Sequence, residues 1–172
     1  MNLSIKLLSI FTILALSGFI FVNAATEDTI NATVTFQQIA ITASDGTISY
    51  GTLAASASQD TVTLTDTQTI TNTGNVAEDF DVKGLDPTTG GSCTHWTMSS
   101  DDSPGANEYA HEWSITGGSG DDWNVFTSTY EEFASNKAED ATASLDLKIT
   151  MPTTSDCMDA QNVDVTVLAS AH

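Results

Sequence analysis

Basic side chains are almost absent from this sequence. Its 172 residues hold 4 Lys and Arg in total against 23 Asp and Glu, and all four basic residues are lysines. The formal net charge is −19 at pH 7. Such a surface repels the phosphates of nucleic acids and of anionic lipids. We therefore exclude nucleic acid as a partner and expect no membrane association of the mature chain.

Signatures of common enzyme classes are also missing. The sequence has no Gly-x-Ser-x-Gly elbow, no phosphate-binding glycine loop and no His-Glu-x-x-His motif. Adjacent carboxylates are frequent, but neighbouring residues of a strand point to opposite faces, so such pairs do not form a catalytic dyad. We expect no enzymatic activity and no catalytic residue. A hydrolase is the most distant of the functional alternatives.

Cysteine is scarce, with only Cys93 and Cys157 in the chain. In an oxidising compartment such a pair is expected to form one disulfide, which here closes a loop of more than 60 residues. The alternative is a zinc site in which His95 and His111 join Cys93. The histidines and cysteines lack the paired spacing of zinc motifs, so the disulfide is our prediction.

The only long apolar run lies at the N-terminus. It covers residues 7–22 without a charge and follows the positively charged Lys6. Residues 22–24, Val-Asn-Ala, have the form of a signal-peptidase site. We expect residues 1–24 to be a cleaved signal peptide and the mature protein, from Ala25, to be secreted. The alternative is an uncleaved N-terminal anchor, for which the run is slightly short.

Strand-like alternation of apolar and polar residues dominates the mature chain. Within residues 61–71 the apolar positions Val62, Leu64 and Ile70 share one parity and threonines fill the other, which predicts a long strand. A turn at residues 72–75 and a partner strand at residues 76–83 follow. Further alternation covers residues 109–115, 145–151 and 163–167. The pattern predicts an all-β protein with a single antiparallel sandwich of the jelly-roll or immunoglobulin-like kind over residues 39–172.

Residues 128–138 depart from this alternation. Ser128 and Glu131 have capping-box spacing, and Phe126, Tyr130 and Phe133 recur at helical intervals. We predict one short helix here, packed across an end of the sandwich.

Three tryptophans, Trp96, Trp113 and Trp123, suggest carbohydrate binding as an alternative function. Trp113 shares a strand parity with Tyr109 and His111, which is the pattern of a core face, and Trp96 is close enough to Cys93 to pack on the disulfide. Trp123 is the most open of the three. The alternative is therefore a monomeric secreted module that binds glycans or surfaces through Trp123 and acidic loops.

Loops rich in glycine and serine contain candidate calcium ligands. Hard carboxylate oxygens are the ligands that calcium prefers. A complete Asp-x-Asp-x-Asp-Gly loop is missing, so a solvated acidic loop is the competing interpretation, and we expect no cofactor other than calcium. The candidates are Asp101, Asp102, Asp121 and Asp122.

The apolar phase changes within residues 26–43. Apolar side chains occupy even positions as far as Phe36 and odd positions from Ile39 onward. Because a slip of one residue exchanges the two faces of a strand, a single strand requires a bulge here. Alternatively, the first half is a separate strand that leaves the subunit and completes a neighbour's sheet. Both interpretations stay open. The even-phase residues are Ile30, Ala32, Val34 and Phe36.

The order of segments also resembles a known group of surface proteins. After the leader and the first strand come residues 48–53, Ile-Ser-Tyr-Gly-Thr-Leu, and residues 69–76, Thr-Ile-Thr-Asn-Thr-Gly-Asn-Val. This plan, covering about the first third of the mature chain, is similar to that of the TasA and camelysin biofilm-fibre proteins and of archaeal bundling pili. The resemblance implies a jelly-roll subunit that donates its N-terminal strand, here within residues 25–38. It also implies a homopolymer of copies of this chain, as an extracellular filament or surface layer.

Asn31-Ala32-Thr33 is an N-glycosylation sequon inside this strand. Asn31 has the parity opposite to Ile30 and Ala32, so a glycan there is compatible with burial of the apolar face.

Overall fold

A computed structural model describes residues 27–88, 93, 95–119 and 121–172. The predicted signal peptide, residues 1–24, lies outside the described residues. The chain divides into two compact units, Met1–Thr35 and Phe36–His172. The second unit contains all the strands and both apolar cores. Among the described residues, no helix is long and apolar enough to cross a membrane.

The larger sheet is organised around one C-terminal strand. Strand β9 (Thr142–Thr150) pairs antiparallel with β3 (Gln68–Asn72), β2 (Ser58–Asp60) and β6 (Glu108–Ser114). Shorter strands extend the sheet, which has the order β1-β3-β9-β6-β5 with β2 and β7 off this path. These are β1 (Ile41–Ala43), β5 (Thr97–Met98) and β7 (Asn124–Val125).

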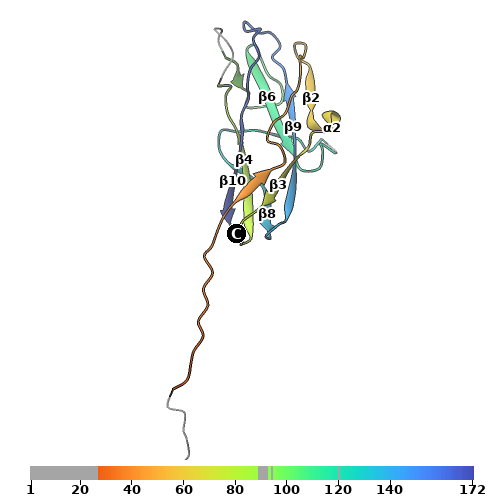
Figure 1. The fold of residues 1–172 in the computed structure, drawn as a ribbon. Helices are drawn as coiled ribbons and strands as arrows, with labels where there is room; N and C mark the ends of the chain where they lie inside the picture. Colours follow the sequence, from red (N-terminus) through yellow and green to blue (C-terminus); the bar gives the residue numbers. More distant parts are fainter. Residues whose placement is uncertain (1–26, 89–92, 94, 120) are drawn as a thin grey trace, which may run out of the picture. The chain divides into compact units, whose positions relative to one another are not determined.

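The smaller sheet has three strands in the order β10-β4-β8. Strand β4 (Glu78–Gly84) lies between β10 (Val165–Ala171) and β8 (Glu131–Lys137), antiparallel to both. Figure 1 shows β4 beside β10 and β6 beside β9 in the two layers of the domain. Both outer strands of this sheet, β10 and β8, have a free edge among the described strands.

An apolar core joins the two sheets, as a sandwich requires. The small sheet contributes Phe80, Val82 and Phe133, and the large sheet contributes Ile70 and Leu145. The rings of Phe80 and Phe133 lie 5.9 Å apart between centroids, within the range of favourable aromatic pairs. A second, smaller core of Trp96, Tyr109 and Ile149 lies at the other end of the same interface. The prediction of an all-β sandwich with a disulfide and one short helix is confirmed.

The position of the short helix was predicted wrongly. Residues 128–138 contain strand β8 and not a helix, because Phe133 packs on Phe80 and the strand pairs with β4. The carboxylate of Glu131 accepts a hydrogen bond from the Thr127 hydroxyl instead of capping a helix. Pairing across the sheet overrides the local helical spacing.

The helix is α2 (Thr61–Leu64), inside the region where the alternation predicts a long strand. The Asp60 side chain caps it by accepting from Thr63 N at 2.7 Å. Thr61, not Val62, is the buried residue, since its hydroxyl donates to Asp146 and accepts from Leu147 N. The apolar parity therefore gives the wrong buried face at this site.

The segments on either side of residues 72–75 do not form a hairpin. Strand β3 belongs to the larger sheet and β4 to the smaller one, so the connection crosses the sandwich. Asn72 is fully buried at this crossing, and its amide donates to Val76 O at 2.7 Å and to Lys137 O at 2.8 Å. A strand does form here, at residues 78–84 where residues 76–83 were predicted, but its partners are β10 and β8.

Candidate assembly site

Residues 27–40 form no strand in the described chain, although their sequence alternates as a strand does. The even-phase side chains are among the most exposed apolar groups of the molecule. Ile30 is 91 %, Val34 97 % and Phe36 88 % exposed, and Ala32 is exposed as well. Isolated apolar side chains are common on surfaces, but three large ones in register on one segment indicate a binding face.

The odd-phase residues belong to the domain. Ile41 in β1 is partly buried and packs against the main core, and Ile39 is 45 % exposed. The change of phase at Gln37-Gln38 therefore lies between the exposed even-phase residues and Ile41, the first apolar residue of this segment that packs on the domain's own core. Donation of the even-phase half remains a prediction, as does glycosylation of the exposed Asn31.

Side chains from the β3–β4 connection hold the chain immediately before β1. The Asn75 amide donates to Phe36 O at 2.7 Å and accepts from Gln38 N at 2.8 Å. Asn75 N also donates to Gln38 O at 3.1 Å. The side-chain amide thus replaces the peptide group of a neighbouring strand and holds residues 36–38 in strand-like pairing.

Glu78, the first residue of β4, completes this arrangement. Its fully buried carboxylate accepts from Ala40 N at 2.8 Å, while Ala40 O accepts from Thr73 N and Gly74 N. A Cβ at Gly74 would collide with Gln38 O and with the Glu78 carboxylate, so this approach requires glycine. We call Asn75 and Glu78 the clasp. Asn75 lies in the turn predicted at residues 72–75, and the one sequence signal for a buried carboxylate is the place of Glu78 on the apolar parity of β4.

An apolar groove opens between the two sheets beside β10. It has a volume of about 1060 Å³, and its floor includes the core residues Ile70, Leu145 and Leu147. Strand β10 and its preceding loop form one wall through Val163, Val165 and Val167, and residues 46–53 form another. Buried core residues therefore lie beneath this groove, and partly exposed valines line one of its walls.

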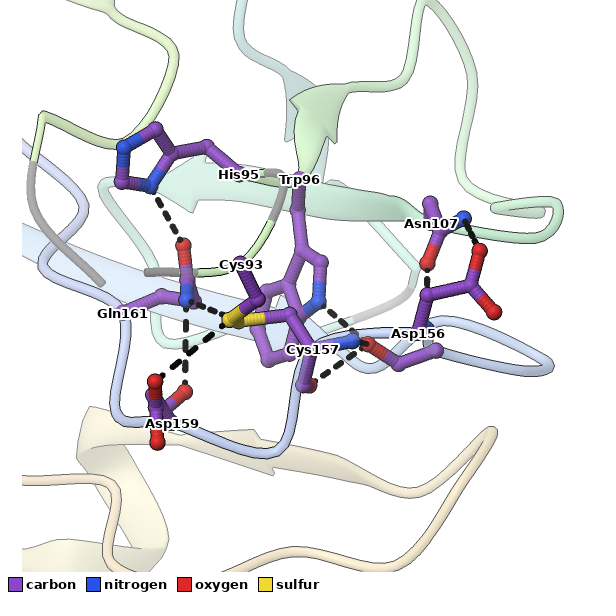
Figure 2. Close-up of a disulfide and its surroundings, with 9 residues drawn as sticks. Cys93, His95, Trp96, Asn107, Asp156, Cys157, Asp159 and Gln161 are labelled. Carbon is purple, nitrogen blue, oxygen red and sulfur yellow. Dashed lines mark hydrogen bonds between the residues drawn. A yellow bond between two sulfur atoms is a disulfide. The ribbon is translucent and has the colours of Figure 1, made fainter. Parts of the chain in front are cut away.

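The predicted disulfide between Cys93 and Cys157 is present, with a Cα–Cα distance of 5.3 Å. Figure 2 shows it beside Trp96, whose indole nitrogen donates to Ser155 Oγ at 2.8 Å. Ser155 in turn donates to Cys157 O at 2.7 Å. The imidazole of His95 contacts the side chain of Gln161, and Cys93, its neighbour in the alternative zinc site, is bonded to Cys157. The bridge therefore fastens the loop before β10 to the smaller core, and such bonds persist in oxidising environments.

The four candidate calcium ligands lie in two different loops. Asp101 and Asp102 accept hydrogen bonds from neighbouring serines, and Asp122 accepts from Ser114 and Thr116. In the described ranges, the only group of three potential ligands is Cys93, Cys157 and Asp159, whose cysteines are joined in the disulfide. Within the described residues, Asp101, Asp102, Asp121 and Asp122 contribute to no such group.

The tryptophans contribute mainly to packing. Trp96 and Trp113 are each 8 % exposed, in the two cores. Trp123 is half-buried, with Lys148 Nζ 5.1 Å from its ring centroid and Gly118 so close that a Cβ there would overlap the indole. Trp96 and Trp113 are therefore core residues, and Trp123 is the only one of the three that is more than slightly exposed.

His111 is a buried titratable group at the floor of the groove. Its Nε2 lies 3.2 Å from the Tyr50 hydroxyl, and its Nδ1 has no hydrogen-bond partner among the described residues. Burial lowers the pKa of His111 from 6.5 to about 3. Burial also raises the pKa of Tyr50, so both groups are neutral at physiological pH.

We predict that acidification destabilises the domain through His111. Between pH 6.5 and about 3 the unfolded state binds a proton at this imidazole and the folded state does not. The contribution of neutral, buried His111 to the free energy of unfolding is therefore complete above pH 6.5, and it is lost as the pH falls towards about 3. Urea unfolding of the wild type and of His111→Gln from pH 7 to pH 4 measures it, since carboxylate titration is common to both. Parallel pH profiles for the two proteins would contradict the prediction.

Comparisons with protein-family models, with curated proteins and with solved structures returned no match to this chain.

Proposed function

We propose that this protein is a secreted structural subunit that polymerises by donating its N-terminal segment to another copy. The product is an extracellular filament or surface layer, and the role is structural and not catalytic. The observation that carries the proposal is the exposure of Ile30, Val34 and Phe36 on a segment that alternates as a strand yet pairs with no described strand.

Burial of this face supplies a driving force for association. Removing an Ile, Val or Phe side chain from water contributes about 1.5–3 kcal/mol, so the three together contribute roughly 5–9 kcal/mol before the costs of association. Main-chain hydrogen bonds to a sheet edge add to this. Each copy has one segment to give, and the contact is heterologous, so repetition of it produces a filament.

The clasp supports the same role. It fixes the main chain from Phe36 to Ala40 to the body of the domain through Asn75 and Glu78. A donated segment can hold two subunits together under tension only if its C-terminal end is bonded firmly to its own domain. The hydrogen bonds to a buried carboxylate and to a side-chain amide provide this attachment.

The test is a charge substitution on the even-phase face. In the chain beginning at Ala25, Ile30, Val34 and Phe36 are all replaced by Asp. We expect the wild type to form filaments visible by negative-stain electron microscopy and the variant to sediment as a monomer. A buffer of physiological ionic strength reduces the mutual repulsion of these acidic subunits.

A matched control places the same three charges on the opposite parity of the same segment, at Thr29, Thr33 and Thr35. This variant has the same net charge and length, so it should still form filaments. The proposal is wrong if the wild type stays monomeric at high concentration, or if both variants lose assembly equally.

A further inference from the structure

We propose that the acceptor for the N-terminal segment is the free edge of β10 together with the groove beside it, and that the occupant is residues 30–36 of a second copy of this chain. This inference rests on the proposed function and identifies the surface that assembly uses.

The pairing of β10 with β4 defines which of its main-chain groups are available. At its two ends, Leu85 N donates to Asp164 O and His172 N donates to Ala77 O. The register between them is continuous. Because hydrogen-bonded residues alternate in an antiparallel pair, the even positions of β10 bond to β4. The main-chain groups of Val165, Val167, Ala169 and Ala171 therefore face away from β4, on an edge that no described strand covers.

The side chains along this edge are covered only on one side. Val165, Val167 and Ala169 pack against the main core but stay partly exposed, whereas Phe80 and Val82 on neighbouring β4 are fully buried. Across the groove, Ile48 and Tyr50 are likewise only partly buried. An added strand on β10 would place one of its faces over this gap, since side chains of adjacent strands share a face.

The donor segment matches the edge in length and chemistry. Strand β10 has seven residues, and Ile30–Phe36 is also seven residues, which span roughly 23 Å as a strand. Its inward face is entirely apolar, and the floor of the groove includes the apolar residues Ile70, Leu145 and Leu147. Its outward face consists of Asn31, Thr33 and Thr35, which remain in water. By contrast β1, on the opposite side of the groove, has only three residues.

A second copy fits better than the segment's own domain. The clasp adjoins the C-terminal end of β10, because Glu78 pairs with Ala171 and bonds to Ala40 N. To run along its own β10, the chain would have to reverse before the clasp at Phe36. Residues 26–43 contain no glycine and no proline for such a turn, and the turn would use the residues that fill the groove. A neighbour's segment has no such constraint.

The test uses proline on the acceptor edge. A proline at position 169 removes one outward main-chain N–H without touching the ladder to β4, and edge strands tolerate such a residue. The acceptor is the full chain with Ile30→Asp, Val34→Asp and Phe36→Asp, a variant that cannot donate its own segment. A fluorescent peptide of residues 27–37 is titrated into it. We expect saturable binding, weakened at least tenfold by Ala169→Pro, and loss of filaments when Ala169→Pro is placed in the wild-type chain.

The matched control is Ala43→Pro, the same change on the opposite free edge of the groove. By the same alternation, the Ala43 N–H faces away from β3. Circular dichroism and thermal unfolding establish that both variants fold. If Ala43→Pro loses the peptide and Ala169→Pro retains it, or if both retain it, β10 is not the acceptor although assembly by donation stands. If the peptide does not bind and the wild type forms no filaments, the proposed function itself is wrong.

Discussion

Removal of the Cys93–Cys157 disulfide is expected to lower the free energy of unfolding by about 4 kcal/mol. The bridge joins residues 64 apart in sequence, and the loop it closes contains five of the strands, β5 to β9. Without it the unfolded chain regains the conformational freedom that the cross-link removes. Urea unfolding of the wild type and of the double variant Cys93→Ser/Cys157→Ser measures the difference.

Reduction of the wild type separates the cross-link from packing. Cys157 is 1 % exposed, so serine in its place also introduces a buried hydroxyl. If reduction and double substitution lower the free energy of unfolding equally, the loss is due to the cross-link. A shift below 1 kcal/mol in the reduced protein would contradict the expectation.

Asn72→Ala is expected to cost roughly 2–4 kcal/mol, because it removes both hydrogen bonds that the buried amide donates to main-chain carbonyls, at about 1–2 kcal/mol each. The side-chain amide donates to Val76 O and Lys137 O, and its oxygen accepts from Gly74 N at 2.8 Å. These bonds fix the crossing from the larger sheet to the smaller one and tie it to the end of β8. Thermal and urea unfolding of the variant measure the loss.

Asn75→Ala is the matched control for this substitution. It makes the same chemical change three residues away, but its amide is exposed and bonds only to the main chain of Phe36 and Gln38. Water can replace those bonds, so we expect a cost of about 1 kcal/mol. Equal losses in the two variants would show that the crossing depends on something other than buried hydrogen bonds.

The sequence predicts a strand correctly where one face of the strand is buried and the other face is partly exposed. In β4 the residues at positions 78, 80 and 82 are buried and those between them are half-exposed, and β9 and β10 also lie where alternation predicts strands. It failed where a distant partner decides the local structure. Thr61 is buried because Asp146, 85 residues away, accepts a hydrogen bond from its hydroxyl. No local pattern contains that information.

The candidate site was partly visible in the sequence for the same reason. The change of apolar phase at Gln37-Gln38 is local, and it marks where exposed residues give way to Ile41 in the domain core. The clasp was missed because its bonds join residues 37 and 38 apart, and because an asparagine before a strand ordinarily indicates a turn. The groove depends on which strands end at a sheet edge, which only the topology determines.

The place of β9 and β10 in the sheets has a consequence for synthesis. Strand β9 is the partner of β2, β3 and β6, and β10 covers β4, yet both belong to the last third of the chain. Neither layer can be completed while these residues are still within the ribosome, and distant pairings of this kind form slowly. Strands β2, β3, β4 and β6 therefore lack these partners until residues 142–171 have been made. A chain without completed sheets is one that can be threaded through a narrow translocation pore.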